Sequence, residues 1–261
     1  MKLCIVTAVF NLRKTRPLEY YTIPAVDFLN DFLNSEIEIC LFTNLDKNIF
    51  PQAQNIHIIQ KSPDSFISEM WDNENWRAEY TTALEARLKI QSQKIEQNTN
   101  PELLSVWLGK FPMMKFASQY GDMVLWHDSG VRTTMLWNQD FTKYKKCKLY
   151  PEKYLSFIQS LNYPLVFMKN DGYDNQFHGV SMSKYETPGK HYQVRAGFIL
   201  AKSSETTLLQ KRIKEKWWIL THHKEYGTEE NALTMYQWQR PDSGLLSCDE
   251  WLDGLGLKNL S

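Results

Sequence analysis

The segment around His127, Asp128 and Ser129 is where residue types and spacing in this sequence first point to chemistry. Four apolar residues, 123–126, come directly before these polar ones, and Gly130 follows them. A buried strand that brings a carboxylate to the edge of a sheet and then turns on a glycine is typical of a place that holds a charged group. Two plainer interpretations stay open. Asp128 could cap the turn, and His127 could be a hydrogen-bonded histidine at the end of a strand.

Polar residues also follow two other apolar runs. An arginine guanidinium suits a phosphate oxygen, and short hydroxyl or amide side chains can bind a base or a ribose. The alternative is that the amides and carboxylates only cap turns. The residues concerned are Thr7, Asn11 and Arg13 after the first run, and Thr43, Asn44 and Asp46 after the second.

Strands and helices are expected to alternate along the chain, which predicts an α/β sheet. Apolar, β-rich runs occur at residues 2–10, 36–44, 55–60, 122–130, 163–170 and 194–202. Helical spacing or composition occurs at residues 24–34, 65–97, 101–120, 204–224 and 228–238, with Gly109 and Pro112 expected to interrupt or kink the third of these. In such folds ligands bind beyond the carboxyl ends of the strands, so the polar residues named above should converge there.

Composition narrows the class of protein. The chain has 261 residues, 43% of them hydrophobic, which predicts one globular domain with a sizeable core. Thirty basic residues balance thirty acidic ones, which argues against a nucleic-acid partner. The four cysteines include no CxxC pair, as is typical of a reducing compartment. No segment reaches the roughly 20 apolar residues of a membrane span, and the apolar run at 3–10 is followed by no cleavage site for secretion.

Several segments together resemble bacterial glycosyltransferases of the GT-A type, and most of all the HtrL/YibB-type family. They are KLCIVTAVFNLR near the start, WLGKFPMMKFASQYGDMVLWHDSGVR in the middle, and VRAGFILAK followed by GTEENALTMYQW. The resemblance spans about residues 3–238. It implies a single GT-A-like (Rossmann-like) α/β domain with a mixed, mostly parallel central sheet flanked by helices. The nucleotide-binding part would cover about residues 1–132 and the acceptor-binding part about 133–261.

The resemblance also implies a nucleotide-sugar donor, with a UDP-sugar as the expected one. In that superfamily an apolar strand ends in Asp-x-Asp, which holds a divalent cation on the donor diphosphate. Asp128 matches the first aspartate, and Gly130 stands in place of the second. We therefore expect Mn²⁺ or Mg²⁺ at Asp128, held in a weaker cage than two carboxylates make. The residues expected to contact the donor are Thr7, Ala8, Asn11, Arg13, Asn44, Lys110, His127, Ser129, Ala196 and Gly197.

Positive charge is needed where the leaving diphosphate gathers negative charge. Lys110 and Arg13 are the expected sources, and Arg132 and Arg195 are further basic candidates. For Lys110 the plainer interpretation is a solvated lysine on a helix.

Glu229 and Glu230 are the expected acid–base residues, together with Asp128 in the catalytic set. An inverting transfer needs a carboxylate that takes the proton of the acceptor hydroxyl. The segment GTEENAL, residues 227–233, resembles the acidic segment that faces the acceptor in many GT-A enzymes. The plainer interpretation is a helix start that Thr228 caps and that favours acidic residues on electrostatic grounds.

The function implied is sugar transfer to a glycan or lipid-linked glycan during synthesis of a surface polysaccharide or lipooligosaccharide. It would take place in the cytoplasm or peripherally at the inner face of the cell membrane. Residues 211–224, KRIKEKWWILTHHK, could form an interfacial patch for a lipid-linked acceptor, or only an amphipathic helix with its apolar face inward.

Two other functions stay open. The first is a non-catalytic carbohydrate-binding or scaffold protein of the same fold, which the missing second aspartate allows. The second is a metal-dependent phosphohydrolase, suggested by the doublet of His127 and Asp128. That enzyme would need further His and Asp ligands on an all-helical scaffold, which the apolar strands and the total of six histidines disfavour.

Overall fold

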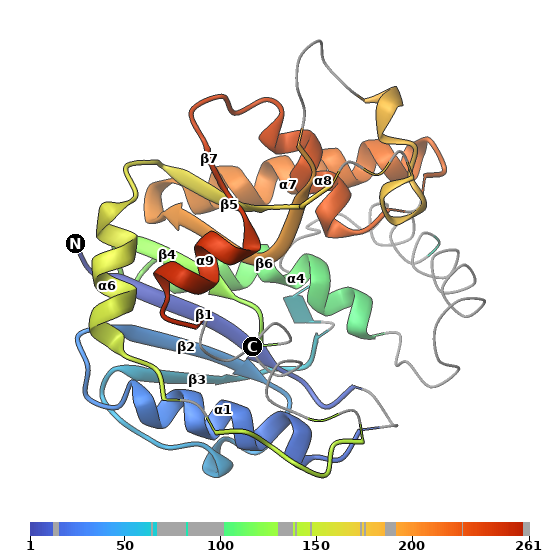
Figure 1. The fold of residues 1–261 in the computed structure, drawn as a ribbon. Coiled ribbons are helices and arrows are strands. Elements are labelled where there is room, and N and C mark those ends of the chain that lie inside the picture. The colour runs from blue at the N-terminus through green and yellow to red at the C-terminus, as the bar shows by residue number, and fades with distance from the viewer. Residues whose placement is uncertain are drawn as a thin grey trace.

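A seven-stranded sheet forms the centre of the computed structural model, and helices cover both of its faces (Figure 1). The structure describes residues 1–12, 16–63, 65–66, 82, 102–129, 138, 140–146, 148–172, 174, 176–185, 192–225 and 227–257. The strands are β1 (Leu3–Val9), β2 (Glu38–Thr43), β3 (Ile56–Gln60), β4 (Met123–His127), β5 (Leu165–Lys169), β6 (Val194–Lys202) and β7 (Gly244–Leu246). The α-helices are α1 (Glu19–Asp31), α4 (Glu102–Ala117), α6 (Pro151–Ser160), α7 (Thr206–His222), α8 (Glu229–Gln237) and α9 (Cys248–Gly254). Short 3₁₀ turns are η1 (Lys47–Ile49), η2 (Phe177–Gly179), η3 (Met182–Lys184) and η4 (Ser203–Glu205).

The order of the strands across the sheet is β3-β2-β1-β4-β6-β5-β7. All neighbouring pairs are parallel except the two that β6 makes with β4 and β5. Among the described strands, β6 therefore runs in the reverse direction, and its first residues lie at the edge where β1 and β4 end. The expected α/β fold with a mixed, mostly parallel sheet flanked by helices is confirmed.

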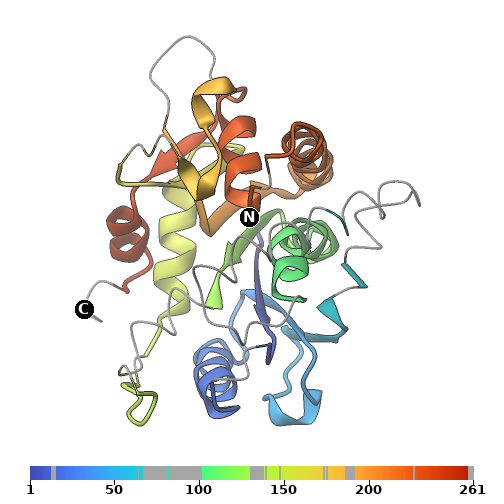
Figure 2. The ribbon, with the colours of Figure 1, turned by 90° about the vertical axis from the view of Figure 1, so that its right-hand side faces the viewer.

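Both faces of the central strands are covered, which explains why their sequences are apolar without interruption. Along β1, Val6 and Ala8 belong to a core shared with α4, α7 and α8, whereas Ile5 and Val9 belong to a core shared with α1, α6 and α9. Figure 2 shows α1, α6 and α9 on one side of the sheet and α4 and α7 on the other. β4 is buried along its whole length, so it can deliver its last residues only to the sheet edge.

The expected strands are all present, and the helices differ in detail. α1 begins at Glu19, before the expected segment, and it contains Pro24. α4 continues through Gly109 and Pro112, so the interruption expected at these residues is absent from this helix. The helix expected at 65–97 lies largely outside the described residues. α6, β7 and α9 were not expected from the sequence.

The helix α7 is an ordinary amphipathic helix. It buries Leu209, Ile213, Trp217 and Leu220, which recur every three or four residues and face the core. This outcome favours the plainer interpretation of residues 211–224 over an interfacial patch. Within the described part of the chain, no helix is long and apolar enough to cross a bilayer.

Candidate active site

A pocket of about 410 Å³ lies at the carboxyl ends of the parallel strands. Its size is within the range of small-molecule sites, and its place is where open α/β sheets bind ligands. The strands contribute Thr7, Ala8 and Val9 of β1, Trp126, His127 and Asp128 at the end of β4, and Arg195 and Gly197 of β6. The strand ends therefore converge on one cavity.

Lys110 places a buried ammonium group beside this pocket. Its side chain is 4% exposed, and Nζ lies 2.8 Å from Glu229 Oε1 and 3.4 Å from Asp128 Oδ2. Nζ also lies 3.5 Å from the carbonyl oxygen of Ala196. Burial lowers the pKa of Lys110, but the charges of Glu229 and Asp128 outweigh it and raise the pKa above its ordinary value. Lys110 is thus not a solvated helix lysine; it links α4 to the end of β4 and to α8.

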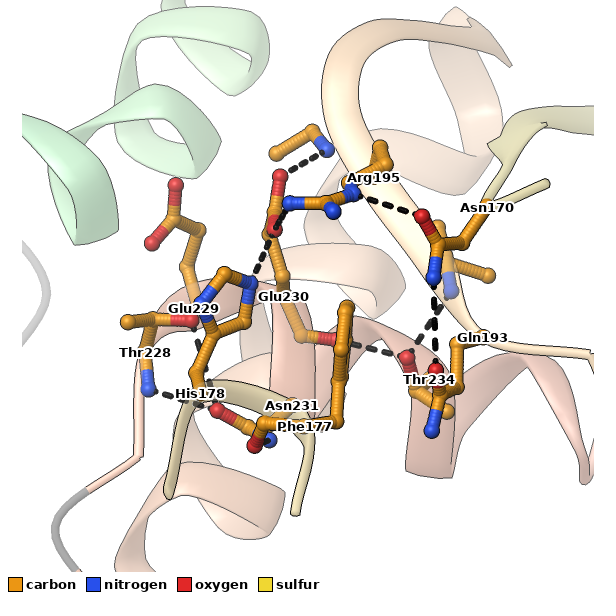
Figure 3. Close-up of polar contacts among 12 residues, drawn as sticks. Asn170, Phe177, His178, Gln193, Arg195, Thr228, Glu229, Glu230, Asn231 and Thr234 are labelled. Atoms are coloured by element: carbon orange, nitrogen blue, oxygen red, sulfur yellow. Dashed lines mark hydrogen bonds and ion pairs between the residues drawn. The ribbon is translucent and has the colours of Figure 1, made fainter. Parts of the chain in front are cut away.

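The glutamate pair begins α8, and its first member faces Lys110. Thr228 and Asn231 form a capping box at this end, as the plainer interpretation expects, and the cap fixes where the two glutamates point. Glu229 is 5% exposed, and Figure 3 shows its carboxylate directed toward the ribbon of α4. Burial and the adjacent Glu230 raise the pKa of Glu229 despite the nearby ammonium of Lys110. Glu229 therefore pairs with Lys110 and is not among the described residues that line the pocket.

Glu230 faces the pocket and is held at both carboxylate oxygens (Figure 3). Oε1 accepts a hydrogen bond of 2.8 Å from the backbone N–H of Ala196. Oε2 lies 2.5 Å from His178 Nε2 and 3.4 Å from Arg195 Nη1. Burial raises the pKa of Glu230, but His178 and the N–H of Ala196 outweigh burial, so the pKa lies below its ordinary value. The structure thus separates the two glutamates into a buried partner of Lys110 and a carboxylate that faces the pocket.

Asp128 and Ser129 continue from β4 into the pocket. The backbone N–H of Asp128 donates to the carbonyl of Gly197 at 2.9 Å, which extends the pairing with β6. Its side chain is 33% exposed, the most accessible of the carboxylates around Lys110. The hydroxyl of Ser129 donates to the carbonyl of Ala8 at 2.9 Å and so ties β4 to the end of β1.

His127 is mainly a packed residue. It is 2% exposed, and its ring centroid lies 5.6 Å from that of Phe28 and 4.9 Å from that of Phe198. The hydroxyl of Tyr154 lies 3.4 Å from His127 Nε2. The structure agrees with the interpretation of a hydrogen-bonded histidine at a strand end, although the residue also forms part of the pocket wall.

Other expected donor residues are not brought into the pocket. The backbone N–H of Asn11 donates to Asn44 Oδ1 at 3.1 Å, and neither residue belongs to the described lining. Asp46 caps η1. Ala196 contributes only its backbone, to Glu230 and Lys110. The expectations for Arg13, Gly130 and Arg132 lie outside the described residues.

An aromatic wall of the pocket was missed by the sequence analysis. Arg16, Tyr20 and Tyr21, at and before the start of α1, line the pocket, and Trp107 of α4 does so as well. The guanidinium carbon of Arg16 lies 4.3 Å from the centroid of the Tyr20 ring. Tyr20 itself is 5% exposed and Arg16 covers its ring, so the half-buried Tyr21 and Trp107 are the rings that a planar ligand can reach. No sequence signal distinguished these aromatic side chains from core residues, because their exposure depends on where α1 meets the strand ends.

The described residues can offer a divalent cation one carboxylate, that of Asp128. Among these residues, no three His, Cys, Asp or Glu side chains gather as a metal cage. Glu229 faces Lys110, and Glu230 faces His178 and the backbone of β6. Hard cations take six or more oxygen ligands. A cation at Asp128 therefore fits only where a bound diphosphate and water supply most of its ligands.

A scan of the chain against protein-family models finds no matching family, and a search of curated proteins finds no relative. The function of the pocket is therefore inferred from its geometry and from the sequence segments quoted above.

Proposed function

We propose that this protein is a glycosyltransferase that moves a sugar from a nucleotide-sugar donor, with UDP-sugars as the first expectation, to a glycan or lipid-linked glycan. The observation that carries the proposal is the meeting of Lys110, Asp128 and Glu230 around one pocket at the carboxyl ends of a mostly parallel sheet. The three residues come from α4, β4 and α8, so only the folded chain brings them together. The resemblance of the same segments to GT-A-type enzymes supports this assignment.

The donor would bind with its ring system against the aromatic wall and its diphosphate toward the charged end. Tyr21 and Trp107 line the pocket and are only half-buried, so their rings would stack on the nucleobase. Lys110 and Arg195 also line the pocket and would place positive charge beside the leaving diphosphate, which gains negative charge as its bond to the sugar breaks. Asp128 would hold the divalent cation, Mn²⁺ or Mg²⁺, that the resemblance implies, and that cation would offset the charge of the diphosphate.

Glu230 is the residue we assign to the acceptor. It is held in place by the backbone of β6 and by two side chains, and it faces the pocket as an ionised carboxylate. A carboxylate in this position can take the proton of the acceptor hydroxyl while the new glycosidic bond forms. This single displacement inverts the anomeric centre.

Replacing Asp128 with asparagine tests the proposal. With a panel of nucleotide sugars and a glycan acceptor, we expect wild-type protein to release a nucleoside diphosphate only when acceptor is present. Asp128→Asn should lower that rate about 100-fold, because the carboxylate that would hold the divalent cation on the diphosphate is lost. Asp122→Asn is the matched control, since Asp122 is an exposed aspartate at the opposite end of the same strand. Wild-type turnover in Asp128→Asn would refute the role assigned to Asp128.

The same assays separate the two alternative functions. A phosphohydrolase would release inorganic phosphate from simple esters without any acceptor. A binding module would hold a glycan but would neither bind a nucleotide nor cleave its sugar. We propose that the sugar transfer takes place in the cytoplasm or at the inner face of the membrane, during the assembly of a surface polysaccharide or lipooligosaccharide.

A further inference from the structure

We propose that His178 is a positioning residue for sugar transfer, which keeps Glu230 ionised and oriented toward the acceptor hydroxyl. This inference rests on the proposed function, and no sequence pattern singled out His178. Its Nε2 lies 2.5 Å from Glu230 Oε2, across 52 residues of sequence. The side chains of His178 and Glu230 are 26% and 15% exposed, so the contact between them is largely buried.

The backbone at His178 is held in an uncommon conformation. Its φ and ψ are 50° and 32°, in the left-handed region, and the next residue, Gly179, has φ of 81°. Non-glycine residues enter this region infrequently, and they stay there only where the surroundings hold them. Here the neighbouring Phe177 is 2% exposed, and its carbonyl accepts a 2.7 Å hydrogen bond from Asn231 Nδ2.

Asn231 connects the position of His178 to that of the glutamates. Its Oδ1 accepts the backbone N–H of Thr228 at 2.8 Å in the capping box of α8, and its Nδ2 binds Phe177. Asn231 is fully buried. At Gly227 a Cβ atom would lie 2.7 Å from Asn231 Oδ1, so the approach to this side chain requires glycine. One buried amide thus fixes both the start of α8 and the turn that carries His178 (Figure 3).

A second buried amide anchors the segment that leads into this turn. Gln193 is fully buried, and its Oε1 accepts the backbone N–H of Asp174 at 2.9 Å. The N–H of Asn170 donates to the carbonyl of Gln193 at 2.8 Å, and Asn170 Oδ1 accepts a 2.9 Å bond from Arg195 Nε. Arg195 and His178 are therefore aimed at the same carboxylate oxygen by two separate anchors (Figure 3).

Among the described residues, Glu230 is contacted by His178 of η2 and by Arg195 and the N–H of Ala196 on β6. The charges of Lys110 on α4 and of Glu229, the preceding residue, act on it without direct contact. Burial alone would raise the pKa of Glu230, and the contact with His178 is the largest of the effects that oppose it. His178 is thus the group whose removal should most change how readily Glu230 ionises.

In the transfer step, the acceptor oxygen forms a bond to the anomeric carbon, and the bond from that carbon to the diphosphate oxygen breaks. The hydroxyl proton passes to Glu230, and the bonding electrons leave with the diphosphate. Glu230 must be ionised to take this proton, so activity should be lost as the pH falls through its pKa in the folded protein. Because His178 lowers that pKa, it extends activity toward acid pH.

His178→Gln tests the inference, because glutamine can still donate a hydrogen bond but cannot carry charge. We expect the acid limb of the kcat/KM profile to move upward by about one pH unit. His223→Gln, at an exposed histidine after α7, is the control and should leave the limb unchanged. A merely structural role for His178 would instead lower kcat/KM by the same factor at every pH, and that result would overturn the inference.

A measurement without substrate keeps this test separate from the proposed function. The carboxyl carbon of Glu230 can be titrated by ¹³C NMR in wild type and in His178→Gln, with Glu230→Gln to identify its signal. The midpoint should rise in His178→Gln, and an unchanged midpoint overturns the inference whatever the activity. A shifted midpoint in a protein that transfers no sugar would refute the proposed function but support the coupling between the two side chains.

Discussion

Replacing Lys110 with methionine is expected to lower the free energy of unfolding by about 3–5 kcal/mol and to abolish sugar transfer. Lys110 and Glu229 are 4% and 5% exposed and lie 2.8 Å apart. Methionine has a similar length but no charge, so Glu229 would stay buried without its partner. Removing one member of a buried ion pair carries a cost of this size because the other charge is left unpaired. Denaturant unfolding of the variant gives the measurement.

Lys115→Met is the matched control for this change. Lys115 lies on the same helix, in its last turn, and is exposed, so its replacement should change stability by less than about 0.5 kcal/mol. The double variant Lys110→Met/Glu229→Gln should recover much of the lost stability, since no uncompensated charge remains at Glu229. The double variant should not recover sugar transfer, because the ammonium group of Lys110 near the diphosphate is still missing. Unfolding of Lys110→Met at the wild-type denaturant midpoint would contradict the ion-pair account.

Replacing Glu230 with glutamine is expected to reduce kcat by about 10² to 10⁴-fold, the usual contribution of a general base. The amide oxygen can still accept the N–H of Ala196, so the fold and donor affinity should change little. Single-turnover kinetics with saturating donor would measure the effect on chemistry directly. The product of the wild-type reaction should carry the inverted anomeric configuration, because the assignment is to a single displacement.

Glu225→Gln is the control for Glu230→Gln. Glu225 also pairs with a cation, Lys184, near the same end of α8, but it does not belong to the described lining of the pocket. Its side chain is 17% exposed, close to the 15% of Glu230, so the two carboxylates are matched in burial. Its replacement should leave kcat within about twofold, because Glu225 lies outside the described lining. If Glu230→Gln kept wild-type kcat, or if the anomeric configuration were retained, the acceptor base would have to be sought elsewhere.

The fold was largely predictable because most of its strands are buried on both faces. Such strands are continuous apolar runs, and five of the seven observed strands, all except β3 and β7, are of this kind. β7 has only three residues, and α9 only seven, which is too short for a clear periodicity. The reversed direction of β6 also had no local signal, since strand direction depends on the path of the chain between strands.

The site was predictable only in part, for a related reason. The rule that ligands bind at strand ends located Thr7, Asp128 and Ser129 at the pocket, but not Asn11 and Asn44, which bind each other instead. Gly197 was expected from the resemblance alone. The strand-end rule could not distinguish Glu229 from Glu230. These two residues differ only in the direction in which their side chains leave the first turn of α8. His178 and the wall at Tyr20 were missed because their positions arise from tertiary contacts between distant segments.

The measurement that tests the central claim most directly is thermal unfolding of the purified protein with UDP, GDP and CMP and their common sugar conjugates, each with and without Mn²⁺. A ligand that binds only the folded state at 100 times its Kd stabilises it by about 2.7 kcal/mol. We predict that one nucleotide and its sugar conjugate raise Tm, and that Trp107→Ala weakens this effect while Tyr150→Ala, at an exposed tyrosine outside the described lining, does not. A folded protein whose Tm is unchanged by every nucleotide would contradict the assignment of this pocket to a nucleotide-sugar donor.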